Sequence, residues 1–209
     1  MTLRLTLADR WSARRGPPKG AVGLVYVIDR GKFEWQAVLL LASLRRRFGE
    51  RIAVYAYVPE QVWDQIDPRV LAFHRENGVE PIPLKTTDAG FARPYPHGNK
   101  ILACAAPRPE ALSLFVDTDV LFLNAADPVA ALSGAAMGAV PASDGPWRPD
   151  NAEMWQAAYA ALGLEAPPQP YPYFNAGVIL FRNDAQFGPT RDQRFGDVWL
   201  DLAQRLDHA

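Results

Sequence analysis

The stretch Ala21–Phe48, AVGLVYVIDRGKFEWQAVLLLASLRRRF, decides the fold class of this chain. Its first part, Ala21–Ile28, is a short apolar run rich in valine and bounded by a glycine and an aspartate. Such a run is typical of a strand that is buried on both faces of a parallel sheet. The second part, Phe33–Phe48, has apolar residues at helical spacing and ends with three arginines, which suit a helix C-terminus. The stretch therefore predicts a strand followed by a helix.

The same alternation continues along the rest of the chain. Further strands are expected at Ile52–Val58, Val79–Leu84, Leu112–Val116, Ala136–Pro141 and Val178–Phe181. Helical segments are expected at Gln61–Asn77 with a break at Pro68, and at Asn99–Ala106, Asp127–Leu132, Asn151–Leu162 and Asp192–Leu206. Strands that alternate with helices predict an α/β fold, Rossmann-like, with a mostly parallel sheet flanked by helices. We expect residues 1–20 to form a loose leader, with a short strand at Leu3–Leu7, and residues 21–209 to form a single domain.

Composition narrows the class of protein. The chain has 209 residues, of which 49% are hydrophobic and 22% charged, and its formal net charge is -1. A nucleic-acid-binding protein would usually show a basic excess, so no nucleic-acid partner is expected. No apolar run approaches the roughly 20 residues of a transmembrane helix, and no signal peptide is visible, so we expect a cytoplasmic protein. The single cysteine, Cys104, lies among small apolar residues and is predicted to be a core thiol.

Two acidic residues mark the segment Phe115–Leu123, FVDTDVLFL. Asp117 and Asp119 stand one residue apart at the end of an apolar strand, with apolar residues on both sides. Carboxylates held against a core are costly unless something compensates their charge. Mn²⁺ and Mg²⁺ prefer such oxygen ligands, and ligands bind at the carboxyl ends of strands in open α/β sheets. The segment predicts a divalent-metal site, although a turn cap at Asp117 and a surface ion pair at Asp119 remain an alternative.

A second segment, Tyr173–Phe181, reads YFNAGVILF and adds weight to this interpretation. Asn175 and Gly177 come just before a hydrophobic run. Glycine allows the backbone to approach a ligand closely, and asparagine offers both a donor and an acceptor. Taken alone, the segment would also suit an ordinary turn before a strand.

With these two segments in this order, the chain resembles the glycogenin-like glycosyltransferases, a retaining family with the GT-A fold. The resemblance extends over about residues 21–182. It implies transfer of a hexose from a nucleoside-diphosphate sugar, often linked to UDP, to an acceptor hydroxyl. The acceptor would be a carbohydrate, a lipid-linked molecule or a protein. The resemblance also implies a metal cofactor, usually Mn²⁺ and otherwise Mg²⁺.

The resemblance assigns roles to individual residues but identifies no catalytic residue. Asp119 would hold the metal directly, and Asp117 would contact the metal, the ribose of the donor, or both. The other donor-binding residues would be Lys100, Asn175, Gly177, Ile28 and Asp29, the last two at the base pocket. Phe33 and Trp35 could stack on a base, but packing within the helix is the expected role of both.

The chain also departs from the family pattern. The family has an Asp-Gln motif after the helix that follows the Asn-Gly segment, and a late histidine as a third metal ligand. Neither motif follows the last predicted helix; Asp192-Gln193 precedes that helix, and His208 is close to the end of the chain. A truncated or non-catalytic sugar-nucleotide-binding domain is therefore an alternative. A nucleotidyltransferase is less favoured, because Asp29–Lys32 is short and poor in glycine for a triphosphate-binding loop. His97 is expected in a loop and His74 on a helix surface.

Overall fold

The computed structural model describes residues 19–87, 89–92, 95–124, 127–132, 134–141, 152–167, 174–188 and 190–208. Within these residues the chain forms a six-stranded sheet of order β3-β2-β1-β4-β6-β5. The strands are β1 (Val22–Val27), β2 (Ala53–Pro59), β3 (Ile82–Leu84), β4 (Leu112–Val116), β5 (Met137–Pro141) and β6 (Phe174–Arg182). The pairs β1–β2, β2–β3 and β1–β4 are parallel, whereas β6 runs antiparallel to both β4 and β5. The predicted α/β fold with a mostly parallel sheet is confirmed.

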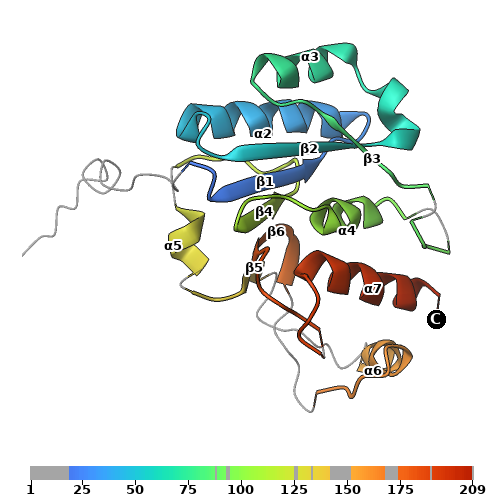
Figure 1. The fold of residues 1–209 in the computed structure, drawn as a ribbon. Coiled ribbons are helices and arrows are strands. Elements are labelled where there is room, and N and C mark those ends of the chain that lie inside the picture. Colours follow the sequence, from blue (N-terminus) through green and yellow to red (C-terminus); the bar gives the residue numbers. More distant parts are fainter. Residues whose placement is uncertain are drawn as a thin grey trace, which may run out of the picture.

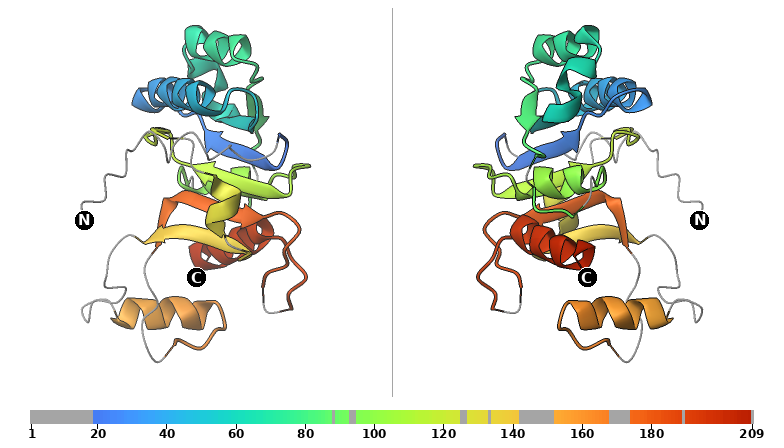
Figure 2. Two further views of the ribbon diagram at one scale, coloured as in Figure 1. Left: turned by 90° about the vertical axis from the view of Figure 1, so that its left-hand side faces the viewer. Right: turned by 90° about the vertical axis from the view of Figure 1, so that its right-hand side faces the viewer.

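Helices flank this sheet, as predicted. They are α2 (Lys32–Phe48), the 3-10 helix η1 (Glu60–Gln65), α3 (Pro68–Glu76), α4 (Gly98–Ala105), α5 (Pro128–Leu132), α6 (Ala152–Ala161) and α7 (Phe195–Asp207). Helices α2 and α3 lie at the β1–β3 end of the sheet, and α6 and α7 lie at the other end (Figure 1). Helix α6 stands apart from the sheet beyond α7 (Figure 2) and has no buried residue. None of the described helices is long and apolar enough to cross a membrane.

The sheet separates two hydrophobic cores. Leu24 and Tyr26 of β1 join the core with α2 and α3, whereas Val25 joins the core with α4 and α7. Successive side chains of a strand point to opposite faces, so the apolar run of β1 supplies both cores. Cys104 is only 3% exposed in the second core, which confirms the predicted core thiol, and burial raises its pKa to about 12.

The observed elements differ from the predicted ones at several ends. The predicted helical stretch Gln61–Asn77 is two helices, separated because the residue before Pro68 avoids helical dihedrals. The predicted strand Val79–Leu84 keeps only its last three residues, at the sheet edge. Strand β6 begins at Phe174, so Asn175 and Gly177 lie within the strand rather than in a turn before it. The predicted strand Leu3–Leu7 lies outside the described residues.

The expectation that His74 lies on a helix surface is wrong. Val70 and His74 are one turn apart on α3, and both are fully buried against the first core. The Nδ1 atom of His74 lies 2.7 Å from the carbonyl oxygen of Val70, and its ring lies 5.9 Å from that of Tyr26. Because Nδ1 donates to this carbonyl, the second ring nitrogen is the unprotonated one, and it has no partner among the described residues.

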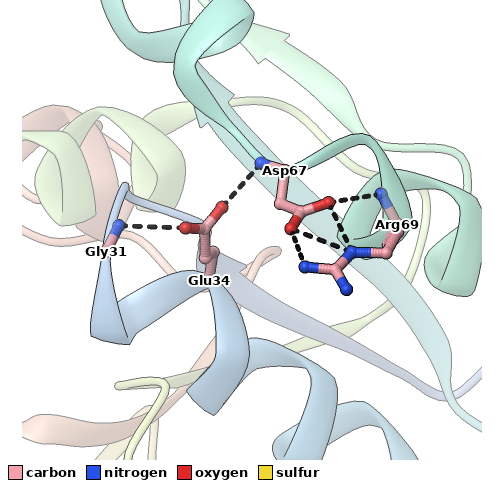
Figure 3. Close-up of polar contacts among 4 residues, drawn as sticks. All are labelled: Gly31, Glu34, Asp67 and Arg69. Atoms are coloured by element: carbon pink, nitrogen blue, oxygen red, sulfur yellow. Dashed lines mark hydrogen bonds and ion pairs between the residues drawn. The ribbon is translucent and has the colours of Figure 1, made fainter.

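A buried carboxylate joins the start of α2 to the start of α3 (Figure 3). Glu34, 8% exposed, accepts a hydrogen bond from the backbone N–H of Gly31 at 3.2 Å and another from that of Asp67 at 2.8 Å. Asp67 in turn caps α3, since its Oδ1 accepts from the N–H of Arg69 at 2.9 Å. Gly31 has φ 76°, which favours glycine. These contacts fix the turn between β1 and α2.

We expect Glu34→Ala to lower the free energy of unfolding by about 1–3 kcal/mol, because it leaves two backbone N–H groups without their acceptor. Glu76→Ala is the matched control, since Glu76 is an exposed glutamate on α3. Urea unfolding of both variants followed by circular dichroism measures the difference. Equal stability of the two variants would show that Glu34 does not hold this junction.

Burial lowers the pKa of His74 below its ordinary value of 6.5, mainly by desolvation of the charged ring. The unfolded chain therefore binds the proton more readily than the folded one. The resulting stability is complete above pH 6.5 and is lost as the pH falls through the lowered pKa of the folded state. Unfolding free energies between pH 7.5 and 5.0 should fall more steeply for the wild type than for His74→Leu, by up to about 1.4 kcal/mol per pH unit. Parallel pH profiles of the two proteins would contradict this assignment.

Candidate functional site

The carboxylate of Asp117 is the centre of the candidate site. It follows β4 directly and lies 2.9 and 3.1 Å, through its two oxygens, from Nζ of Lys100 on α4. The ammonium group also lies 5.6 Å from the centre of the Phe115 ring. Because the Lys100 side chain is only 19% exposed, solvent screens this ion pair less than one at the surface. We call Asp117-Thr118-Asp119 the acidic turn. Lys100 thus neutralises one of its two carboxylates.

The other side of Asp117 packs against Gly177 of β6. The backbone N–H of Asp117 donates to the carbonyl of Gly177 at 2.7 Å. A Cβ atom at position 177 would come within 2.9 Å of Oδ2 of Asp117 and 2.8 Å of Oδ1 of Asn175. That Asn175 oxygen already accepts the N–H of Gly177 at 2.6 Å. Only glycine fits here without displacing the carboxylate, which is the physical reason for a glycine at position 177.

A cavity of about 440 Å³, which we call cavity A, opens beside this contact. Its wall includes three carboxylates, Asp29, Asp117 and Asp119, and one ammonium, Lys100. With Lys100 paired to Asp117, the carboxylates of Asp29 and Asp119 have no ion-pair partner in the described part of the chain. The cavity wall therefore carries an excess of negative charge, which favours a cation.

A second cavity of about 570 Å³, cavity B, adjoins the first. The two share Asp29, Pro96 and Asn99. Cavity B lies where β1, β2 and β3 end, and its wall includes Pro59, Gln61, Thr86, Thr87, Phe91 and Tyr95. This is the edge of an open α/β sheet at which ligands bind. A ligand with a flat part and a charged part could extend through both cavities.

Asn99 lies at the junction of the two cavities and was not singled out in the sequence. It is 6% exposed, and its side-chain amide makes no hydrogen bond to another described residue. A polar group in such a wall normally has a partner, so a ligand is a candidate for that partner. The sequence offered no signal for it, because Asn99 appeared only as the first residue of a predicted helix.

The other candidates are less central. Ile28 is fully buried in the first core and does not line either cavity, whereas Asp29 lines both. Phe33 and Trp35 are 45% and 44% exposed, so the expectation that they pack within the helix is wrong. Trp35 falls on the outer side of α2 with Leu39, whereas Phe33 lies on another side of the helix and lines cavity A.

Of the histidines and the Asp192-Gln193 pair considered as further metal ligands, only His97 lines cavity A among the described residues. His97 lines cavity A, but among the described residues no three acidic, histidine or cysteine side chains gather as metal ligands. His208 lies at the far end of α7, where its Nε2 is 2.9 Å from the carbonyl of Gly90. Gln193 pairs with Phe187 in an isolated bridge away from cavity A. Within the described part of the chain, Asp117 and Asp119 therefore remain the candidate ligands of a metal in cavity A.

No curated protein matches the chain in sequence. The crystal structure of mouse xyloside xylosyltransferase 1 in its apo form has a TM-score of 0.48 at 14% identity, over 90% of this chain and 73% of that one. The apo structure of WbbM, a bifunctional glycosyltransferase, has a TM-score of 0.50 at 13% identity, over 90% of this chain but only 34% of WbbM.

The likeness to WbbM concerns the fold, and it agrees with the GT-A fold predicted from the sequence. In sequence, the model of the Rhodobacterales glycosyltransferase domain matches residues 24–209, which is most of the chain and includes both cavities and the acidic turn. The chain therefore belongs to the Rhodobacterales glycosyltransferase domain family.

Proposed function

We propose that this domain transfers a hexose from a nucleoside-diphosphate sugar, with UDP as the expected nucleotide, to an acceptor hydroxyl. The observation that carries the proposal is the contact of three separate segments at one cavity. Asp117 after β4 contacts both Lys100 of α4 and Gly177 of β6, and Asp119 lies with Asp117 and Lys100 in the wall of cavity A. An acidic turn next to the partly buried ammonium of Lys100 suits a ligand that carries a diphosphate and a divalent cation.

The two cavities divide the donor between them in this proposal. Cavity B, at the strand ends, has the aromatic rings of Phe91 and Tyr95 in its wall. It would take the base and ribose. Cavity A holds the charged groups and would take the diphosphate and the sugar. Asn99, at the junction, would supply the hydrogen bonds that its amide does not make within the described chain.

The donor set of cavity A fits Mn²⁺ or Mg²⁺. Asp119 would hold the ion with a free carboxylate, and Asp117, already paired with Lys100, would add a partly neutralised one. Mg²⁺ usually binds one or two carboxylates and completes its shell with water and substrate phosphates, so the absence of a third described ligand is compatible with it. When bound, such an ion stabilises the negative charge of a departing nucleoside diphosphate.

The chain's own residues would contribute position and charge. Lys100 would place a second positive charge near the diphosphate, in a wall where few water molecules screen it. Gly177 and Asn175 would hold Asp117 in place and leave room for the sugar. Retention of configuration is part of the proposal and rests on the resemblance to glycogenin-like enzymes. A domain that binds the donor without turnover is the alternative, and release of UDP on incubation with UDP-sugars distinguishes the two.

Asp119→Asn should abolish the dependence of UDP binding on Mn²⁺, because it removes the unpaired carboxylate of the acidic turn in cavity A. Calorimetric titration of UDP with and without Mn²⁺ measures this, with an expected loss of at least about tenfold in affinity, or about 1.4 kcal/mol. The control is Asp201→Asn, at an exposed aspartate of α7 that lies 3.6 Å from Arg205. If Asp119→Asn binds UDP and Mn²⁺ like the wild type, the metal assignment is wrong.

Gly177→Ala should move the Asp117 carboxylate, because the new Cβ atom would lie 2.9 Å from Oδ2. We expect the unfolding free energy to fall by about 1–3 kcal/mol, together with a weaker affinity for UDP. Gly138→Ala in β5 is the matched control, since a Cβ atom there would meet only Leu132, at the ordinary distance of 3.4 Å. An affinity for UDP that stays the same in Gly177→Ala would separate Asp117 from the donor site.

A further inference from the structure

Helix α2 carries an apolar stripe on its outer side that the donor site does not use. Three apolar residues, Trp35, Leu39 and Ala42, and the flanking cations Lys32 and Arg46 recur at helical spacing and therefore share one side of the helix. All five are exposed, and Leu39 is exposed to 59%. Helix α2 lies at the periphery of the molecule (Figure 2). No acidic residue interrupts this stripe.

The segment after the acidic turn runs alongside α2. Thr118 Oγ1 lies 3.4 Å from Oε1 of Gln36, near the start of the helix. Four residues later, the backbone N–H of Phe122 donates to Oγ of Ser43 at 3.0 Å, two turns further along the helix. The two contacts fix the direction and the register of this segment against α2.

Along Asp119–Leu123 the side chains alternate between exposed and partly buried. Phe122 packs edge-on against Phe48 at 5.7 Å, whereas Leu121 and Leu123 turn outward and are 50% and 70% exposed. The segment that carries both leucines runs along the Gln36 and Ser43 side of α2, which adjoins the outer side with Leu39. We call the four exposed side chains Trp35, Leu39, Leu121 and Leu123 the apolar ridge. Large apolar side chains gathered on one exposed surface mark an interaction site more often than single ones do.

Positive charge borders the apolar ridge at the end of α2. Arg46 and Arg47 are exposed and make no ion pair with any described residue. Their neighbour Arg45 is used differently, since it donates to the carbonyls of Asn77 and Gly49 and faces the charge of Glu50. Two free guanidinium groups, two helical turns from the exposed Leu39, are complementary to a surface that is apolar beneath and anionic on top.

We propose that the apolar ridge, with Arg46 and Arg47, docks this domain on an anionic lipid surface. Trp35, Leu39, Leu121 and Leu123 would enter the headgroup region, as the apolar side of an interfacial helix does. The two arginines would contact lipid phosphates. A protein partner fits less well. The core of a protein–protein interface is usually depleted of charge, whereas the unpaired Arg46 and Arg47 border the apolar ridge.

The position of the apolar ridge links it to the donor site. Leu121 follows Asp119 by two residues, and Phe33 and Gln36 of α2 line cavity A. A domain bound through the apolar ridge would hold cavity A next to the lipid surface, where an acceptor hydroxyl on a lipid-linked molecule would be within reach. This consequence for the acceptor rests on the proposed function, whereas lipid binding itself does not.

Co-sedimentation of the whole chain with vesicles tests the proposal. We expect binding to phosphatidylcholine vesicles that contain 30% phosphatidylglycerol, weaker binding to pure phosphatidylcholine, and loss of binding at high salt. The variant Leu39→Asp/Leu123→Asp should bind the anionic vesicles at least tenfold less. Arg46→Gln/Arg47→Gln should lose about fivefold for each arginine removed. Circular dichroism and UDP titration in the absence of vesicles check that the variants fold and keep the donor site.

Met154→Asp on α6 is the matched control, because Met154 is 58% exposed, close to the 59% of Leu39, but α6 and α2 lie at opposite ends of the molecule (Figure 1). Its binding to anionic vesicles should equal that of the wild type. The proposal is overturned if the wild type fails to bind anionic vesicles, or if Met154→Asp loses binding as strongly as the ridge variant. Neither result depends on UDP affinity, so the lipid proposal and the proposed function fail independently.

Discussion

The antiparallel pairing of β6 with β4 is the constraint on which the candidate site depends. Because the two strands run in opposite directions, the beginning of β6 lies beside the end of β4. Gly177 therefore sits next to Asp117, and the backbone hydrogen bond between them fixes their separation. If β6 had continued the parallel order, its first residues would lie at the opposite edge of the sheet. The Asn-Gly segment would then be about one strand length away from the acidic turn.

The charge arrangement around Asp117 follows from this pairing and from α4. One side of the carboxylate packs against a residue without a side chain, and the other side meets the ammonium of Lys100. Helix α4 is held in place through the second core, where Cys104 and Ala103 pack with Phe115 and Phe181. Core packing on one face of the sheet thus determines which carboxylate of the acidic turn is neutralised, and Asp119 is left without an ion-pair partner among the described residues.

The two faces of the sheet contribute differently to the structure. The face with α4 and α7 supports the charged site, whereas the face with α2 and α3 is stabilised by the buried carboxylate of Glu34 and the ring of His74. Helix α2 has one side in the first core and another side exposed to solvent. Its inner side fills the first core, its first turn borders cavity A, and its outer stripe of Trp35 and Leu39 stays exposed. A fold and an interaction surface can share one helix because its sides face different environments.

Much of the fold could be predicted from the sequence alone, because most of its helices and strands have a recognisable local sequence pattern. The buried strand Ala21–Ile28, the following helix, the break before Pro68 and the strand Leu112–Val116 all depend on periodicity, proline geometry and turn residues within a few positions. Asp117, Asp119, Asn175 and Gly177 could be selected because their chemistry stands out against apolar neighbours. The burial of Cys104 was predictable for the same local reason.

Only the tertiary structure decided which residues meet. The ion pair of Lys100 with Asp117 spans 17 positions, and the contact of Asp117 with Gly177 depends on a strand direction that no local pattern encodes. Ile28 and Asp29 are adjacent in sequence, yet one enters the core and the other lines both cavities. His74 is buried and Trp35 exposed, against expectation, because burial depends on which side of a helix its neighbours cover. Sequence determines the chemistry that is present, and packing between distant segments determines where that chemistry acts.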